Sequence, residues 1–258
     1  MQSSSTGRPG AKLQFGFSEQ HRDVVHDRRS RRQKALKALA ILRDCLGPLD
    51  ELMALDLGCA AGNSTATYGT AFKLVAAVDI DVDALRYAHR ENTTDNVVYA
   101  QMNGQRLAFR DETFDVVICT HIYEHVPDAA ALMSEIRRVL KPGGACFFSA
   151  GNRLSIMEPH YRLPFLSVLP RFLAHAYLRV VGKGDFYYEQ HRTYWGLKRL
   201  VAGFELLDYT KLVVADPKRY CAEDVITPGS WLQHVYRLGL SLAYWACPTY
   251  LWVLRKVR

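Results

Sequence analysis

The sequence predicts a doubly wound α/β fold with a mostly parallel sheet of seven strands. Short apolar runs alternate with helical patterns between residues 52 and 149, and a glycine-rich turn directly follows the first run. Strands that are apolar throughout are typical of a parallel sheet covered by helices on both faces. Such sheets bind ligands at the carboxyl ends of their strands, so we expect the functional site there.

The predicted elements follow a regular order in the first part of the chain. A helix is expected over residues 31–46, where apolar residues recur at helical spacing. Strands are expected at residues 52–57, 74–79, 97–100, 114–119 and 145–149, with helices through Leu85 and Ala88 and around residues 132–140. The latter helix is expected to stop at Lys141-Pro142-Gly143-Gly144, because Pro and Gly end helices.

The regular pattern breaks after residue 150. Residues 158–184 are rich in aromatic residues, Leu and Pro and match no strand–helix unit. We interpret residues 153–190 as a lid inserted between the fifth and sixth strands. A helix at 194–200, a strand at 204–209, a helix near 231–245 and a strand at 250–254 are expected to complete the fold.

The charge of the chain is unevenly distributed. The 258 residues carry a formal charge of +7, with 10 Lys and Arg against 5 Asp and Glu in residues 1–50, 8 against 13 in residues 51–150, and 15 against 8 beyond. This pattern argues against a protein that coats nucleic acid and indicates basic outer segments. These could face an anionic substrate or membrane, or could simply be solvated.

Several compositional features bear on localisation. The six cysteines form no CxxC pair, which fits a reducing cytoplasmic compartment. The first thirty residues are polar and basic and are expected to be a flexible tail without a secretory signal. Residues 238–254 are uncharged, but Pro248 would end a helix, so a helix followed by a strand is favoured over a membrane span.

The glycine-rich turn indicates a nucleotide-like ligand. It reads Asp56-Leu57-Gly58-Cys59-Ala60-Ala61-Gly62, where glycines let a ligand approach the backbone at a helix N-terminus. A dinucleotide fingerprint would also need Gly at positions 60 and 63, which are Ala and Asn here. Asp79, at the end of the second strand, can accept hydrogen bonds from two ribose hydroxyls.

Six segments together resemble the class I S-adenosylmethionine-dependent methyltransferases, especially the type 11 small-molecule group. They are residues 54–63 (ALDLGCAAGN), 78–81 (VDID), 103–109 (NGQRLAF), 114–117 (FDVV), 123–128 (YEHVPD) and 135–144 (EIRRVLKPGG). The resemblance implies a Rossmann-like fold in a single domain of residues 31–258, after a tail of residues 1–30. Within it, residues 50–150 form the cofactor half and residues 194–258 the C-terminal helix and strands.

The resemblance also implies roles for cofactor-binding residues. Gly58, Ala60 and Gly62 would line the methionine end of S-adenosylmethionine, Asp56 would steady its amino group, and Asp79 would hold the ribose hydroxyls. Ile80 would pack on the adenine, while Asn103, followed by Gly104, stands where the family usually has an Asp that accepts from the adenine amino group. Ala60 replaces a usual Gly, which is unstrained only if its φ is negative.

Methyl transfer to a hydroxyl needs a positioned nucleophile and a base that removes its proton. His121, His160 and His191 are the candidate bases, because each lies near an expected strand end or in the insertion. His160 and His191 each have a carboxylate two residues earlier, Glu158 and Glu189, and neighbouring Tyr residues. His125 is interpreted as structural. No spacing of His, Cys, Asp and Glu indicates a metal site, so no metal is expected.

The sequence therefore predicts a methyltransferase that O-methylates a small molecule or a lipid-linked glycan. Methylation of an aromatic or quinone-type metabolite and a non-catalytic cofactor-binding scaffold are the alternatives. Apolar and basic residues in 163–181 and in the last helix would suit contact with a membrane surface at its inner face, or packing on the sheet. No nucleic-acid partner is expected, because an Asn/Asp-Pro-Pro-Tyr/Phe pattern is absent after the fourth strand. The oligomeric state is left open.

Overall fold

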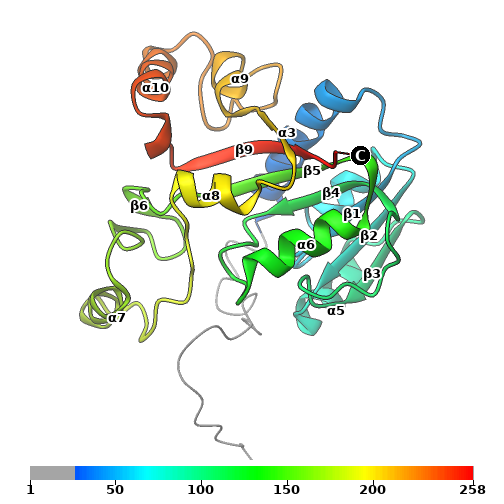
Figure 1. Cartoon of the computed structure of the whole chain (residues 1–258), viewed down its shortest axis with the longest axis horizontal. Helices are drawn as coiled ribbons and strands as arrows, with labels where there is room; N and C mark the ends of the chain where they lie inside the picture. The colour runs from blue at the N-terminus through cyan, green and yellow to red at the C-terminus, as the bar shows by residue number, and fades with distance from the viewer. Residues whose placement is uncertain (1–26, 258) are drawn as a thin grey trace, which may run out of the picture.

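The computed structural model describes residues 27–257 and contains a mixed sheet of seven strands in the order β3-β2-β1-β4-β5-β9-β8 (Figure 1). The strands are β1 Met53–Leu57, β2 Leu74–Asp79, β3 Val97–Gln101, β4 Phe114–Thr120, β5 Leu140–Gly151, β8 Glu205–Asp208 and β9 Thr249–Arg255. The five strands β1 to β5 pair in parallel, and β9 runs antiparallel between β5 and β8. The predicted doubly wound α/β class is confirmed.

Helices cover the two faces of the sheet. They are α3 Arg28–Leu46, α4 Thr65–Gly69, α5 Val82–Glu91, α6 Ala129–Val139, α8 Tyr194–Leu200, α9 Thr210–Ala215 and α10 Trp231–Leu242. Asp81 and Asp128 cap α5 and α6 by accepting two backbone N–H bonds each. One apolar cluster on each face, the first around Ile136 and Trp252 and the second around Leu39 and Val253, fixes the sheet between these helices.

Four elements of the main sheet and its helices differ clearly from the sequence prediction. Helix α3 begins at Arg28 rather than at residue 31, because the Asp27 carboxylate accepts from Ser30 N at 3.0 Å. The short helix α9 was not predicted. The last helix stops at Leu242 and is followed by a 3-10 turn, η1 Tyr244–Ala246.

Strand β5 is the fourth difference, since it extends well beyond the predicted residues 145–149. Leu140 already pairs with Phe114, and the register then shifts before Ala145 pairs with Val116. The predicted helix stop at residues 141–144 is therefore wrong: α6 already ends at Val139, and Pro142, Gly143 and Gly144 lie in an irregular first part of the next strand. A register shift of this kind inserts residues into a strand without breaking its pairing.

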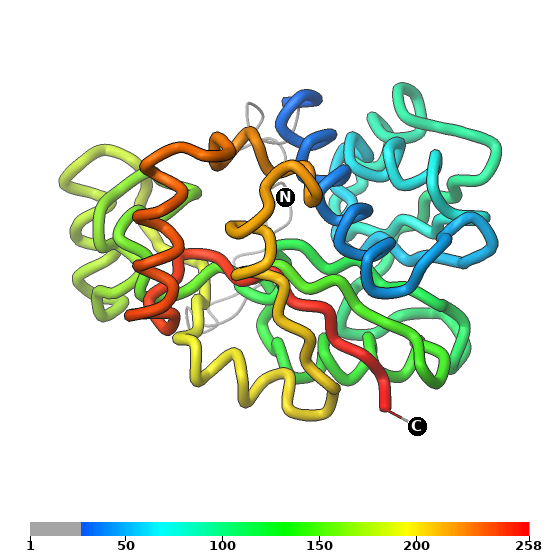
Figure 2. The backbone as a smooth tube through the Cα atoms, turned by 90° about the horizontal axis from the view of Figure 1, so that it is seen from above, coloured from blue at the N-terminus to red at the C-terminus, as the bar shows by residue number. Residues whose placement is uncertain are grey.

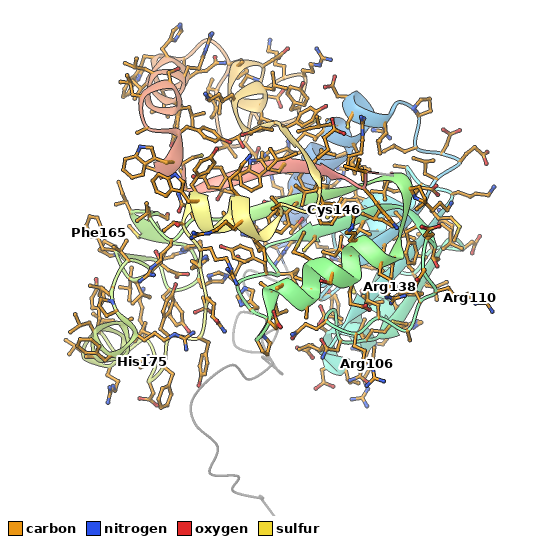
Figure 3. All side chains as sticks on the ribbon, in the orientation of Figure 1. Arg106, Arg110, Arg138, Cys146, Phe165 and His175 are labelled. Atoms are coloured by element: carbon orange, nitrogen blue, oxygen red, sulfur yellow. The ribbon has the colours of Figure 1, made fainter. Side chains whose placement is uncertain are left out.

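The insertion after β5 forms a small unit with its own apolar core. It contains the two-stranded hairpin β6 Met157–Glu158 and β7 Leu163–Pro164, followed by α7 Arg171–Val180. Its core consists of Leu163, Leu166, Ala174, Leu178 and Tyr187. Figures 1 and 2 show it at one end of the molecule, where the chain leaves β5. Figure 3 shows Phe165 and His175 on this unit, far from Arg106 and Arg110 at the opposite side.

The remaining chemical features of the chain can be stated briefly. All six cysteines are unpaired thiols, and Cys146 lies buried within β5 (Figure 3). Among residues 27–257 no helix combines the length and the hydropathy that a membrane crossing requires. The helix-then-strand interpretation of residues 238–254 is confirmed. The predicted N-terminal tail lies largely outside the described residues.

Candidate functional site

The side chains of Ile122 and Tyr99 pack closely against the glycine-rich turn after β1. Gly58 and Gly62 have positive φ angles of 78° and 73°. A Cβ atom at Gly58 would lie 2.2 Å from Ile122 Cδ1, and one at Gly62 would lie 2.6 Å from Tyr99 Oη. Both conformation and space therefore favour glycine at these positions.

Ala60 adopts a positive φ of 47°. The backbone at this alanine is therefore strained. A left-handed alanine costs about 1–2 kcal/mol. Its N–H donates to Asp79 Oδ2 at 2.7 Å, and Asp81 N–H donates to Asp79 Oδ1 at 2.9 Å. Asp79 therefore ties the turn after β1 to the turn after β2. Burial raises the pKa of Asp79, while these two backbone bonds act in the opposite direction.

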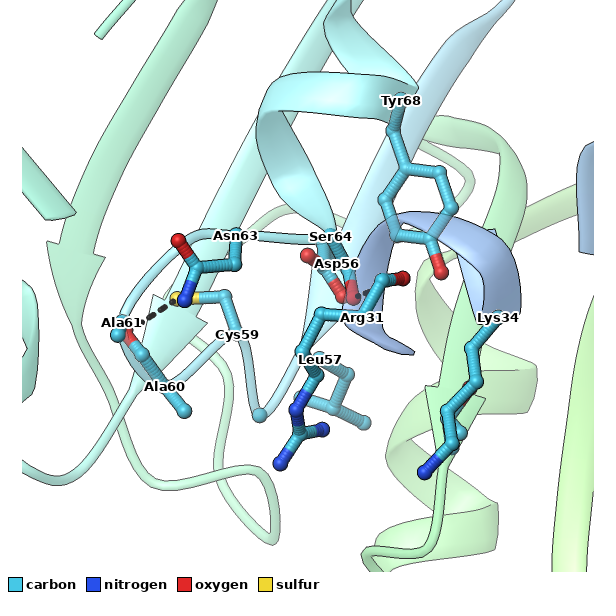
Figure 4. A pocket seen from close by; sticks show the side chains of 12 residues that line it. Arg31, Lys34, Asp56, Leu57, Cys59, Ala60, Ala61, Asn63, Ser64 and Tyr68 are labelled. Carbon is cyan, nitrogen blue, oxygen red and sulfur yellow. Dashed lines mark hydrogen bonds between the residues drawn. The ribbon is translucent and has the colours of Figure 1, made fainter. Parts of the chain in front are cut away.

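A pocket beside the turn brings opposite charges together (Figure 4). Asp56 is 5% exposed, accepts from Thr65 Oγ1 at 2.6 Å, and has its pKa raised to about 7 by burial. Arg31 and Lys34 extend into the same pocket from α3, and burial lowers the pKa of both. Sequence reasoning missed these two cations, because nothing in an N-terminal amphipathic helix shows that it lies against a distant turn.

Thr120, the last residue of β4, is a further pocket residue that the sequence did not single out. Its Oγ1 is buried and has no hydrogen-bond partner. Buried hydroxyls are normally paired, so an orphaned one in a pocket wall indicates a ligand atom. A zwitterionic ligand with a carboxylate and an ammonium group fits a pocket that offers Arg31, Lys34 and Asp56. The methionine end of S-adenosylmethionine is such a ligand.

The other predicted cofactor residues lie at the same edge of the sheet, beside this pocket. Ile80 follows β2, and Met102 N–H donates to Asp79 O at 2.9 Å, which holds the end of β3 next to it. Asn103 Oδ1 accepts from Gln105 N–H at 2.9 Å and keeps a second lone pair for a ligand. A Cβ at Gly104 would lie 3.0 Å from Leu132 Cδ1, so this position is closely packed.

A second cluster begins directly after Thr120. His121, with a positive φ of 55°, places its Nδ1 3.1 Å from Glu124 Oε1 and its Nε2 3.2 Å from Ser149 Oγ. The Glu124 side chain is fully buried, whereas that of His121 is 30% exposed. The cluster therefore contains an accessible imidazole with an orienting carboxylate behind it.

Glu158 gathers the other two predicted histidines. Its Oε1 lies 2.7 Å from His160 Nδ1 and 3.4 Å from His191 Nε2, and its Oε2 accepts from Tyr161 N–H at 2.8 Å. His191 thus contacts Glu158 rather than Glu189, the carboxylate close to it in sequence. Glu189 Oε1 instead lies 4.0 Å from His125 Nδ1, so the sequence predicted the residues but not this pairing.

Electrostatics keep these carboxylates ionised despite their burial. Burial alone would raise the pKa of Glu124 and of Glu158, but hydrogen bonds and charge from the histidines lower each to about 2. For His125, burial dominates and lowers the pKa to about 4. The cluster therefore combines charged carboxylates with an imidazole, His125, that is neutral near pH 7.

A cavity of about 320 Å³ lies between the insertion and the start of α6. Its lining combines aromatic, apolar and basic side chains with Glu189 and His191, and includes Tyr123, Val126, Tyr187, Arg153, Arg171 and Arg192. The insertion thus forms one wall of a cavity next to the histidine cluster.

The fold, the glycine turn and the acidic ends of β1 and β2 define the class I S-adenosylmethionine-dependent methyltransferase architecture. Residues 55–148 match the family model described as a methyltransferase domain, in the type 11 group. Residues 55–148, about a third of the chain, therefore have the sequence of a methyltransferase domain of this group.

Curated relatives share part of their length with this chain. A ubiquinone biosynthesis O-methyltransferase of Paracidovorax citrulli is 32% identical over 148 residues, which are 54% of this chain and 60% of the relative. The protein of the same name in Alkalilimnicola ehrlichii is 36% identical over 118 residues, 45% of this chain and 48% of the relative. The chain thus spans about half the length of these relatives.

Solved structures extend the likeness of fold to most of the chain. A methyltransferase from Mesorhizobium loti matches with a TM-score of 0.55 and 18% identity, covering 86% of this chain and 99% of the other. The [4+2]-cyclase SpnF matches with a TM-score of 0.51 and 16% identity, covering 86% of this chain and 80% of the other. The same fold therefore occurs in a protein described by another reaction, so activity must be argued from the site.

Proposed function

We propose that this protein transfers a methyl group from S-adenosylmethionine to a hydroxyl oxygen of a small aromatic, quinone-type acceptor. The observation that carries this proposal is the His121–Glu124 pair, 3.1 Å apart, which directly follows the cofactor-pocket residue Thr120. The name of the relatives, ubiquinone biosynthesis O-methyltransferase, supports the acceptor class.

The cofactor supplies the methyl group when it is bound. Arg31 and Lys34 would bind its carboxylate, and Asp56 its ammonium group. Asp79 would accept from the ribose hydroxyls, Ile80 would pack on the adenine, and Asn103 Oδ1 would accept from the adenine amino group. Gly58, Ala60 and Gly62 would line its methionine end, while Gly104, packed closely against Leu132, would hold the turn after β3 beside the site.

His121 would act as the general base. Its neighbour Glu124 is buried and ionised, so it orients the ring through Nδ1 and stabilises the imidazolium that forms. Nε2 would then accept the proton of the acceptor hydroxyl in place of its contact with Ser149 Oγ. The remaining task of the protein is to exclude water and align the oxygen with the methyl group.

The 320 Å³ cavity is the proposed acceptor site, with the insertion as its lid. Its wall begins at Tyr123, two residues beyond His121, which itself lies outside the lining. Aromatic side chains Tyr123 and Tyr187 suit an aromatic ring, and Arg153, Arg171 and Arg192 suit an anionic substituent. A hydroxyl of a lipid-linked glycan is the second acceptor class that this lining admits. The panel of acceptors described next distinguishes this class from the aromatic one.

The test is transfer of a labelled methyl group from S-adenosylmethionine to a panel of acceptors. The panel contains catechol and hydroquinone head groups with and without a carboxylate, and lipid-linked sugars. Labelled product from the phenolic compounds, with loss of label transfer in His121→Ala, is the expected result. Label on the sugars alone would overturn the acceptor class, and tight cofactor binding without transfer to any acceptor would favour a scaffold.

We also propose peripheral contact with the inner face of a membrane through α7 and α10, which lie at the same end of the molecule in both views (Figures 1 and 2). Helix α10 exposes 76% of Trp231, 61% of Leu238 and 76% of Leu242, and α7 exposes 70% of Phe172. Exposed apolar residues of this density indicate a binding surface, and Arg179 and Arg237 add positive charge.

Co-sedimentation with vesicles tests this contact. Binding to vesicles with anionic lipid is expected, and the double variant Trp231→Ser/Leu242→Ser should reduce it severalfold without lowering the melting temperature. The matched control is Val98→Ser, an exposed apolar residue on β3. Equal binding of wild type and double variant would rule out α10 as the contact.

A further inference from the structure

In the histidine–carboxylate cluster, possible ligand atoms of three side chains lie close together around one point. Glu158 Oε1, His160 and His191 each present one ligand atom, and these atoms all lie within 4.8 Å of one another. Two of the separations are 2.7 Å, from Glu158 Oε1 to His160 Nδ1, and 3.4 Å, from Glu158 Oε1 to His191 Nε2.

The 3.4 Å separation matches the spacing of ligands around a transition-metal ion, and the 2.7 Å separation is somewhat shorter. Metal–ligand bonds of about 2.0–2.2 Å place neighbouring ligand atoms about 3.0–3.5 Å apart in tetrahedral or octahedral geometry. Only small movements of the side chains would therefore bring all three atoms into bonding distance of one ion.

Contacts with neighbouring groups also fix the orientation of two of these side chains, Glu158 and His160. Glu158 Oε2 accepts from Tyr161 N–H at 2.8 Å, so Oε1 is the oxygen left facing both rings. The His160 ring packs edge-on against His125, with centroids 4.8 Å apart. Outer contacts that fix the orientation of ligating side chains are a regular feature of metal sites.

Burial and charge favour a cation at this place. The side chains of Glu124 and Glu158 are fully buried, and those of Glu189 and His191 are 1% and 3% exposed. Glu124 Oε2, Glu189 Oε2 and His191 Nδ1 have no hydrogen-bond partner. Three carboxyl groups are thus buried together, two of them with an unpaired oxygen atom, and a divalent ion would offer these oxygens a positive partner.

We propose that Glu158, His160 and His191 form a binding site for one divalent transition-metal ion of the Zn²⁺ class. Two imidazoles and one carboxylate suit Zn²⁺, Fe²⁺ or Mn²⁺, whereas Mg²⁺ and Ca²⁺ prefer oxygen ligands throughout. Three protein ligands leave at least one coordination position open, and His191 also lines the proposed acceptor cavity. The ligand completing the site would be an oxygen donor of the acceptor or water.

This site was invisible to spacing rules, because its ligands come from β6, the turn after it, and the segment before α8. Its geometry, burial and charge do not depend on the proposed methyl transfer, so the site stands whether or not that proposal is correct.

The test is metal binding by the untagged full-length chain. After removal of metal with a chelator, calorimetric titration with Zn²⁺, and separately with Mn²⁺, should show one ion bound per chain for at least one of them. His191→Gln and Glu158→Gln should each weaken that binding by more than about 100-fold, since losses in the outer contacts alone cost about 10–100-fold. Loading with Co²⁺ should give visible absorption bands in wild type that are absent in both variants.

The matched controls are His89→Gln and Glu223→Gln, which are exposed and outside the cluster and should bind as wild type does. Near-ultraviolet circular dichroism checks the fold, and His160→Gln replaces any variant that fails to fold. No saturable binding of either ion to wild type would overturn the proposal. Equal affinity in folded ligand variants would overturn it as well. Cofactor binding by calorimetry is measured separately, so a failed metal site and a failed methyltransferase assignment give different results.

Discussion

The glycine turn and the histidine–carboxylate cluster lie at the same edge of the sheet but are built in different ways. Residues 56–62 form the turn as one continuous segment, which hydrogen-bonds to Val78 and Asp79 at the end of β2. The cluster instead draws Glu124, Glu158 and His191 from three segments that are far apart in the chain. The proposed cofactor site is thus built mainly on a local motif, whereas the proposed acceptor chemistry depends on the assembly of distant segments.

Replacing the proposed base, His121, should affect turnover but not cofactor binding, and this is the largest expected difference between the two regions. His121→Ala should lower turnover by about 10²–10⁴-fold, because a positioned general base contributes about that much. S-adenosylhomocysteine affinity, measured by calorimetry, should change less than threefold, since His121 lies outside the cofactor pocket. His234→Gln, an exposed histidine on α10, is the control, and wild-type turnover in His121→Ala would refute the assignment.

The converse experiment disables the turn. Asp79→Ala should weaken S-adenosylhomocysteine binding by at least about 100-fold, because hydrogen bonds to a charged group contribute about 1.5–3 kcal/mol each and two ribose hydroxyls would lose theirs. The variant also removes the acceptor of Ala60 N–H. Asp83→Ala, on the exposed face of α5, should bind normally in the same titration. Unchanged affinity in Asp79→Ala would place the cofactor elsewhere.

Titration of Asp56 gives the turn its own pH dependence. Burial raises the pKa of Asp56 from 3.8 to about 7, so the free protein holds this carboxyl protonated below pH 7. The cofactor ammonium group favours the ionised form, and binding at lower pH must first release the proton. Affinity should therefore fall by up to about tenfold per unit below pH 7 and level off above it. Calorimetry at pH 6, 7 and 8 checks this slope, which Asp56→Asn should abolish.

The smallest expected effect is on stability within the turn. Ala60→Gly should raise the free energy of unfolding by about 0.5–1 kcal/mol, because relief of the left-handed strain exceeds the entropy that Gly adds to the unfolded chain. Ala61→Gly is the matched control, since Ala61 does not have a positive φ and should lose stability. Urea unfolding of both variants measures the difference, and a loss in Ala60→Gly would show that the strain is relieved elsewhere.

The sequence by itself determined the parallel sheet, the glycine turn, and the acidic strand ends at Asp56 and Asp79. These follow from apolar periodicity and from backbone conformations that only certain residues adopt, which are properties of short segments. It also identified His121, His160 and His191 as chemically active candidates by their strand-end or insertion positions.

Only the tertiary structure decided which groups meet. Arg31 and Lys34 reach the cofactor pocket because α3 packs against the first turn, and His191 contacts Glu158 instead of its near neighbour Glu189. The positive φ of Ala60 is likewise fixed by the bond of its N–H to Asp79. Contacts between segments far apart in the chain depend on packing of whole elements, and local sequence patterns do not encode that packing.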